Sequence, residues 1–392
     1  MSKKEIRSTG IIHFWEFPSL YVKINKNFKE QLMNNFFKEK TTNQAAELLH
    51  ISVTTIRNLK KNSYRLKIDY LIKISKHISK KEFSLEEIQK NIVWIGDKSS
   101  YGVVNPNLPF DFNSREGARF LAAICNDGWI SDGVYYSNSD SYLRKSVKSD
   151  GLSIFGGDKN TIKIWIKKKD QYLSFPSIIR DSMISMTDFK GVKSINNPNI
   201  PDIIFKSKDF MCGWVEQTIA DEGCIKFYLE KYRREIIWTR SFKKELPRYN
   251  LHLNELQILN RLGIKCKTYD VGEYYDKDGV LKTRKAIRIA KRKNLIKLRD
   301  LIKIPCKRKE KDFSDMMKSF QRYKEPLIIK EKIINLCNIY GYLTASTLKK
   351  EMNYKRVSNA SKWIKLFEGE GLIKRVKDYS CGSLAKYVLI HK

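Results

Sequence analysis

The chain has 392 residues, a length typical of two or three domains. It carries 76 Lys and Arg against 43 Asp and Glu, and an excess of +33 repels itself unless a polyanion binds. No apolar run approaches the roughly 18 residues of a membrane span, and the first residues lack the apolar core of a signal peptide. We therefore expect a soluble protein that acts on nucleic acid and does not bind a membrane.

The cysteine and histidine pattern excludes a zinc module and a disulfide framework. The seven cysteines contain no Cys-x-x-Cys pair, and the five histidines do not cluster with them. Because the cysteine count is odd, complete intramolecular pairing is impossible, and we predict a protein of the reducing cytoplasm. Any bound metal is expected to be a hard ion held by carboxylates.

Residues 1–104 are predicted to form a helical N-terminal domain. Within it, about residues 42–61 are expected to form two short helices with Thr42 as the first N-cap and a turn at His50. This pattern resembles a helix-turn-helix, a family that usually has glycine at the position of His50. The alternative is an ordinary helical hairpin. In a helix-turn-helix, the second helix would present two side chains to DNA, Arg57 and Asn58.

The centre of the chain contains two related segments. Each is a predicted helix with small residues that ends in an acid followed by glycine and runs into strand-like sequence. The first is FLAAICNDG at 120–128, on a helix capped by Ser114, and its Gly128 suits a left-handed position after the helix. The second ends in IADEG. Asp127 and Glu222 of the two segments are 95 residues apart, the size of a small α/β half-domain.

These segments resemble the repeated motif of the LAGLIDADG homing endonucleases. FLAAICNDG stands where LAGLIDADG stands, and IADEG matches the end of the second copy. Lys193 and Ile200-Pro201 resemble the Lys and Ile-Pro that commonly precede that copy. The resemblance covers about residues 105–320. It implies an α+β fold in which two αββαββα half-domains, 105–205 and 206–320, pack about a pseudo-twofold axis and lay antiparallel sheets over DNA.

The resemblance also implies a Mg²⁺-dependent nuclease centre at the ends of the two motif helices. Two acids and two main-chain carbonyls would hold the metal: Asp127, Glu222, Asn126 and Asp221. Lys193 is the basic candidate of the first half. Lys309 is that of the second half, where the basic run makes the register ambiguous. Six further basic side chains of the half-domains are predicted to contact DNA: Lys163, Lys167, Arg233, Arg240, Arg284 and Arg288.

The second segment departs from the family pattern because it is about four residues longer, an added helical turn. It places Glu216, Gln217 and Thr218 where apolar or small residues normally meet the partner helix. Burying Glu216 without a partner would be costly, so either it faces outward or the register is shifted. With a shifted register, Asp221 would replace Glu222 as the second acidic ligand.

The C-terminal part begins with the densest basic run, 282–311, which has fourteen Lys and Arg and is predicted to form a strand–helix unit with a phosphate-binding face. Residues 326–392 are then expected to form three helices and a two-stranded hairpin, with Thr344 capping the second helix. This order resembles a winged helix, a module that binds DNA or protein. Its recognition helix would offer two side chains to DNA, Asn359 and Lys362.

Three functions fit these features. The first is a site-specific double-strand DNA endonuclease that uses Mg²⁺ and acts as a monomeric pseudo-dimer, with the flanking modules extending its footprint. The second is a transcription regulator that keeps a LAGLIDADG-derived DNA-binding domain without cleavage. The third is an intron maturase that binds RNA. Because both terminal acids are present, we expect the endonuclease.

Overall fold

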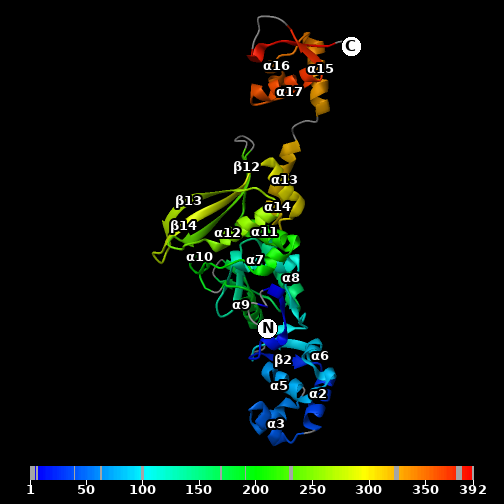
Figure 1. Ribbon diagram of the computed structural model, residues 1–392, viewed down its shortest axis with the longest axis vertical. Coiled ribbons are helices and arrows are strands. Elements are labelled where there is room, and N and C mark those ends of the chain that lie inside the picture. The colour runs from blue at the N-terminus through cyan, green and yellow to red at the C-terminus, as the bar shows by residue number, and fades with distance from the viewer. Residues whose placement is uncertain are drawn as a thin grey trace. The chain divides into compact units, whose positions relative to one another are not determined.

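The computed structural model describes residues 5, 8–38, 40–61, 64–98, 101–167, 170–189, 191–228, 233–321, 326–376 and 382–390. The chain forms two compact units, Met1–Met316 and Met317–Lys392. Helices are combined with small antiparallel sheets in both units, which confirms the predicted α+β class (Figure 1).

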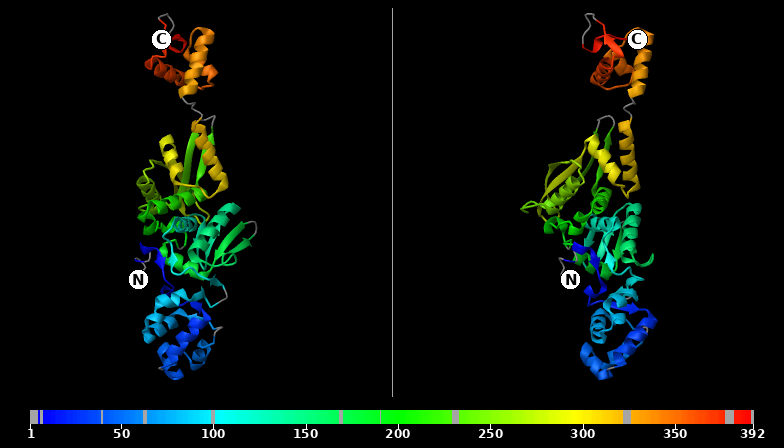
Figure 2. Two further views of the ribbon diagram at one scale, coloured as in Figure 1. Left: turned by 90° about the vertical axis from the view of Figure 1, so that its right-hand side faces the viewer. Right: turned by 45° about the vertical axis from the view of Figure 1, so that its right-hand side comes forward.

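The sequence predicts a helical domain for the first 104 residues, but the structure also contains strands there. They contain a four-stranded antiparallel sheet in the order β3-β2-β4-β5, with the strands Leu66–Lys67, Tyr21–Ile24, Ile92–Gly96 and Gly102–Val104. Helices accompany it in the blue to cyan part of Figure 2: α2 (Lys26–Lys38), α3 (Thr42–Leu49), α4 (Val53–Leu59), α5 (Ile68–Ile78) and α6 (Leu85–Lys90). The strands are short and pair with distant residues, as Val22 does with Ile95, so local sequence patterns do not reveal them.

The segment predicted to resemble a helix-turn-helix contains two consecutive helices, α3 and α4. The N-cap of α3 is Thr41, one residue before the predicted Thr42, and it forms a capping box with Gln44. His50 ends α3 in the left-handed region at φ 55°, the conformation for which glycine is the usual residue. On α4, Arg57 is exposed and Asn58 is half-buried.

The central region runs twice through the same order of elements, α-β-β-α-β-β-α. The first pass consists of α7 (Arg115–Asn126), β7 (Gly128–Ile130), β8 (Val134–Ser137), α8 (Ser141–Phe155), β9 (Lys163–Lys167), β10 (Asp170–Phe175) and α9 (Ser177–Met186). Its sheet has the order β7-β8-β10-β9. Ser114 accepts a hydrogen bond from the Gly117 amide, which confirms the predicted N-cap of α7.

The second pass begins after α10 (Lys193–Asn196). It consists of α11 (Lys208–Glu222), β11 (Cys224–Tyr228), β12 (Arg233–Lys243), α12 (Asn250–Arg261), β13 (Lys267–Tyr275), β14 (Leu281–Ile289) and α13 (Arg292–Leu301). Its sheet order, β11-β12-β14-β13, repeats that of the first sheet. The basic run 282–311 therefore covers most of β14, all of α13 and the start of α14 (Lys307–Gln321).

Helices α7 and α11 pack against each other in the middle of this unit (Figure 1). Their close approach depends on small residues: a Cβ added at Gly213 would lie 2.6 Å from the Arg115 carbonyl oxygen and 3.1 Å from the Ala118 Cβ. Gly128 does not adopt the left-handed conformation that the sequence suggested. A Cβ there would lie 2.6 Å from the Ile124 Cα, so this glycine is required for packing of the strand on the helix.

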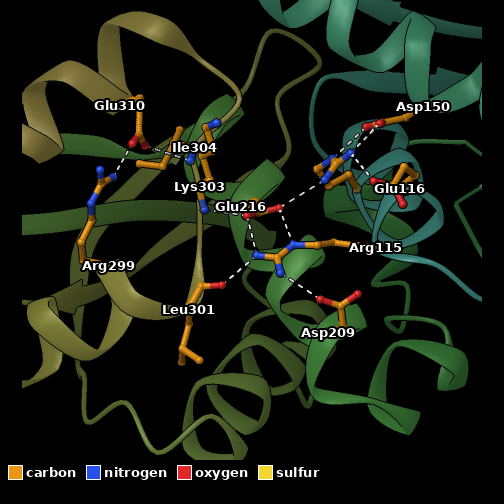
Figure 3. A network of polar contacts seen from close by, with 11 residues as sticks. Arg115, Glu116, Asp150, Asp209, Glu216, Arg299, Leu301, Lys303, Ile304 and Glu310 are labelled. Carbon is orange, nitrogen blue, oxygen red and sulfur yellow. Dashed lines mark hydrogen bonds and ion pairs between the residues drawn. The ribbon is translucent and has the colours of Figure 1, made fainter.

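Glu216 of α11 neither faces outward nor lacks a partner. Its side chain is 2% exposed and accepts hydrogen bonds from the guanidinium groups of Arg115 and Arg119 and from the Lys303 amide (Figure 3). Arg115 also donates to the Leu301 carbonyl, 2.7 Å away. The ion pairs make this acid tolerable inside the helix pair, and they tie the segment after α13 to both helices.

The described part of 326–392 contains three α-helices and a two-stranded antiparallel sheet. These are α15 (Pro326–Tyr340), α16 (Ala345–Glu351), α17 (Val357–Gly369), β15 (Ile373–Arg375) and β16 (Tyr387–Leu389). Thr344 accepts a hydrogen bond from the Thr347 amide, which confirms the predicted cap of α16. The helices enclose a core of their own that includes Ile333, Leu348 and Phe367. On α17, Asn359 is half-buried and Lys362 is exposed.

Candidate functional site

Two acids lie at the C-terminal ends of the packed helices α7 and α11. Asp127 is the C-cap of α7, and its Oδ2 accepts a hydrogen bond from Asn138 Nδ2 at 2.6 Å. Glu222 is the last residue of α11, and its Oε1 accepts one from Arg240 Nη1 at 3.0 Å. Burial, and then the nearby charge of Glu222, raises the pKa of Asp127. Arg240 also donates to Asn126, the residue before Asp127, so one guanidinium connects the two helix ends.

A lysine ammonium closes the C-terminal end of each helix. Lys193 donates to the carbonyls of Ile124 and Asn126, at 2.9 and 3.0 Å, and also to that of Gly128. The ammonium group of Lys309 donates to three carbonyls at the end of α11, those of Ile219, Ala220 and Asp221. Burial lowers the pKa of both lysines, although the helix carbonyls favour a cation at this position. The structure thus places both predicted lysines beside the acids.

The hydrogen bonds of Asp221 distinguish its position from that of Glu222. Asp221 accepts from Tyr136 Oη at 2.7 Å, Gln217 Nε2 at 2.9 Å and Asn126 Nδ2 at 3.1 Å. Burial raises its pKa to about 7. Asn126 and Asp221 thus face each other across the helix pair and are separated by 95 residues, as Asp127 and Glu222 are. This correspondence favours Glu222 as the counterpart of Asp127.

Arg240 belongs to the acid cluster and not to the exposed DNA-contacting face that the sequence suggested. It is 6% exposed, and its guanidinium donates to Glu255 Oε1 and to Asn126 Oδ1, both at 2.6 Å, as well as to Glu222. Strand alternation explains this correction: Arg240 shares a face of β12 with the buried side chain of Trp238, which also donates to Glu255.

Three participants were missed by sequence reasoning: Tyr136, Asn138 and Glu255. Tyr136 and Asn138 bond directly to acids at the helix ends, whereas Glu255 of α12 bonds to Arg240 and Trp238 of β12. No sequence motif marks any of the three. Ile236, Trp238, Arg240 and Phe242 occupy every second position of one strand, and the three apolar residues are buried. This period of two is the sequence signal that indicates a buried arginine with an acidic partner.

Three other predicted DNA contacts lie on strands of the two central sheets: Lys163, Arg284 and Arg288. Lys163 and Arg284 are exposed on β9 and β14 and lie over the rings of Tyr101 and Tyr274. Arg288 pairs with Glu235. The side chains of Lys167 and Arg233 lie outside the described part of the structure. Arg57 and Asn58 belong to α4 of the first unit, and Asn359 and Lys362 belong to α17 of the second.

His252 of α12 contacts the sheet beside this cluster. It is buried, its ring centroid lies 6.5 Å from that of Phe242, and its Nδ1 has no hydrogen-bond partner among the described residues. Burial lowers its pKa to about 4. The folded protein therefore keeps this ring neutral at pH values at which an unfolded histidine is protonated.

We expect His252 to make the protein less stable as the pH falls from about 6.5 toward 4. In that range the unfolded chain binds a proton that the folded ring does not, so stability decreases with decreasing pH. At pH 5 the loss is about 2 kcal/mol, at 1.36 kcal/mol per pH unit. Urea unfolding at pH 7 and pH 5 measures this decrease in the free energy of unfolding. Between the same two pH values, His252→Leu should lose about 2 kcal/mol less stability than the wild type. An equal pH effect in both proteins would contradict this role.

The donor set at the helix ends suits Mg²⁺ better than a metal that needs a full protein cage. Among the described residues, no three His, Cys, Asp or Glu side chains form a metal-holding group. Mg²⁺ keeps several waters and needs only one or two carboxylates, which Asp127 and Glu222 can supply. Burial and, after it, the charge of Glu222 raise the pKa of Asp127, and a cation beside the two acids would offset that second effect.

No helix in the described part of the chain is long and apolar enough to cross a membrane. The sequence matches no protein-family model and no curated protein.

Proposed function

We propose that this chain is a Mg²⁺-dependent, site-specific double-strand DNA endonuclease of the LAGLIDADG type. The observation that carries the proposal is the paired ends of α7 and α11, where Arg240 connects Glu222 to Asn126, the neighbour of Asp127, and a lysine closes each helix. The two passes through α-β-β-α-β-β-α, with the same strand order, support half-domains related by a pseudo-twofold axis. A monomer would then act on both DNA strands.

In this proposal the chain's own residues position the acids and balance their charge. Asp127 and Glu222 would hold Mg²⁺, and the ion would supply an activated water and stabilise the leaving oxygen. The carbonyls of Asn126 and Asp221, which the resemblance adds as ligands, instead accept hydrogen bonds from Lys193 and Lys309. Asn138 orients the Asp127 carboxylate through its 2.6 Å hydrogen bond. Arg240 holds the Glu222 carboxylate, and its positive charge beside the scissile phosphate would stabilise the transition state.

The half-domains differ in the group that holds each acid. Asn138, on the segment after β8, holds Asp127 with a neutral amide, whereas Arg240 of β12 holds Glu222 with a cation. Strand pairing puts Asn138 and Arg240 at corresponding positions. Tyr135 and Ile237 each pair with the residue that follows the motif glycine, and Asn138 and Arg240 each lie three residues further along the chain. The two cleavage centres would therefore have unequal electrostatics.

The test is cleavage of a supercoiled plasmid that carries the chain's own uninterrupted insertion locus. With Mg²⁺ we expect a linear product from a break at one position, and with EDTA we expect none. A plasmid with the locus deleted is the control for specificity. Specific binding without cleavage in Mg²⁺ or Mn²⁺ would contradict the endonuclease. It would favour a DNA-binding regulator, for which the α3–α4 pair and the C-terminal unit would supply recognition helices.

We expect DNA binding by this chain to weaken steeply with salt. The excess of +33 charges predicts that several phosphates are neutralised, and each releases counterions. Log affinity should fall linearly with log salt, with a slope of about −0.9 for each phosphate contacted. Gel shifts without divalent ions at 50 to 200 mM salt measure the slope. A nearly flat dependence would contradict a nucleic-acid partner altogether.

A further inference from the structure

The first central sheet presents a continuous band of aromatic side chains, one from each strand. Strand pairing puts Trp129 of β7 opposite Tyr135 of β8, and Tyr172 of β10 opposite Trp165 of β9. The ring centroids of Trp129 and Tyr135 lie 4.9 Å apart and nearly parallel, and those of Tyr135 and Tyr172 lie 5.8 Å apart. We call these four residues the aromatic band.

The aromatic band lies on the open face of the sheet. The opposite face carries the fully buried side chains of Val134, Tyr136 and Leu173, which belong to the core. In contrast, Trp129 is 38% and Trp165 50% exposed. Large apolar groups gathered on one exposed surface are typical of a binding site, because water there is displaced at little expense when a partner packs against them.

The fold itself does not require the aromatic band. The second sheet has the same strand order and pairing, and its corresponding positions hold Cys224, Ile237, Ala286 and Tyr269. Only one of these four is aromatic. The band is therefore a chemical feature of the first sheet that the shared architecture does not explain.

Positive charge surrounds one end of the aromatic band. Lys163 lies on the same face, and its ammonium lies 4.2 Å from the centroid of the Tyr101 ring. Beside it, a hollow of about 530 Å³ is lined by Trp165, Asn160 and three lysines, Lys148, Lys159 and Lys163, together with two isoleucines and no acid. An exposed ring beside three cations is complementary to a base attached to its phosphate.

We propose that the aromatic band binds the unpaired bases of a single-stranded nucleic acid, with the phosphates along Lys148, Lys159 and Lys163. Every base has a π-face that can stack on these rings, but in a duplex the neighbouring base pairs cover those faces. Tryptophan also offers no acceptor with which to read a base edge in a groove. This inference goes beyond the proposed function, since a duplex target offers no unpaired bases, and it assigns the open face of the first sheet to a single-stranded segment.

The test measures binding of the full chain, in EDTA, to fluorescent 12-nucleotide single strands of RNA and of DNA and to the corresponding DNA duplex. Trp165→Ala and Tyr172→Ala should each weaken single-strand binding about 5- to 150-fold, the loss that 1–3 kcal/mol per stacked base predicts. Duplex binding should change less than about threefold. Trp165→Phe should retain most of the affinity, because it keeps a ring. The RNA and DNA strands distinguish the two sources of unpaired bases.

Tyr275→Ala is the matched control, because Tyr275 is 71% exposed on β13 of the second sheet, outside the aromatic band. Equal losses in this control and in the band variants, equal losses for duplex and single strands, or no single-strand binding by the wild type would each overturn the proposal. Quenching of tryptophan emission by the single strands should disappear in Trp129→Phe/Trp165→Phe if those rings are the ones that stack. Single-strand binding by a chain that never cleaves DNA would contradict the endonuclease and leave this proposal standing.

Discussion

Asp127→Asn and Glu222→Gln will each abolish most Mg²⁺-dependent cleavage while leaving DNA binding intact. Each substitution keeps the side-chain shape and removes a charge that attracts the metal. We expect rates to fall by at least about 10²–10³-fold, the loss typical when one transition-state-stabilising group is removed. Affinity measured without divalent ions should be unchanged or higher, because a negative charge beside the phosphates is lost. Plasmid nicking with Mg²⁺ and gel shifts without it measure the two effects.

Asp221→Asn is the matched control for the register of the second acid. Its amide oxygen can still accept the two hydrogen bonds that Tyr136 and Gln217 donate to Asp221 Oδ1. Only the bond from Asn126 to Oδ2 is lost, so the helix pair should remain folded. If the Asp221 side chain does not bind the metal, this variant keeps most of its activity. Loss of cleavage in Asp221→Asn with activity retained in Glu222→Gln would shift the motif by one residue and contradict our assignment.

Features that depend on local sequence were predicted well. The structure confirms the predicted caps Ser114 and Thr344. Such caps can be found from sequence because an N-cap is a contact between a side chain and an amide three residues away. The helix ends at Asp127 and Glu222 were found for a similar reason, since an acid followed by glycine marks the point at which a strand turns back against its helix.

Features that depend on distant pairing were not predictable in the same way. The N-terminal sheet joins Val22 to Ile95, and neither short strand has a length or alternation that identifies it alone. Gly128 was assigned to a left-handed turn, but its role comes from contact with Ile124. Arg240 looked like a DNA contact because charge alone does not say which face of a strand a residue occupies until the neighbouring strand is known.

Glu216 is the clearest case of a residue whose environment the sequence could not supply. The sequence places Glu216 in a helix interface without a partner. It therefore predicts that Glu216 faces outward or that the register of the motif is shifted. The structure provides three other donors: Arg115 and Arg119 come from α7, about 100 residues earlier, and the Lys303 amide comes from the segment after α13. The acid therefore joins three parts of the unit.

Glu216→Gln will destabilise the first unit by about 3 kcal/mol. Breaking a buried ion pair by removing one partner usually costs about 3–5 kcal/mol, and we expect the lower end because each arginine keeps a second carboxylate, Asp209 or Asp150. The new amide also places N–H donors against guanidinium donors, so at least one hydrogen bond cannot form. Urea unfolding followed by tryptophan fluorescence reports mainly on this unit, since six of the seven tryptophans precede residue 317.

Glu116→Gln is the matched control because Glu116 pairs with the same Arg119 but is 43% exposed. A surface pair of this kind contributes about 0–1 kcal/mol, so the control should unfold close to the wild type. High salt should reduce the small loss of stability caused by Glu116→Gln. It should leave the loss caused by Glu216→Gln nearly unchanged, because buried charges are screened little. If the two variants lose equal stability, the network at Glu216 is only a solvated surface cluster, and the helix pair must be held together by its small-residue packing alone.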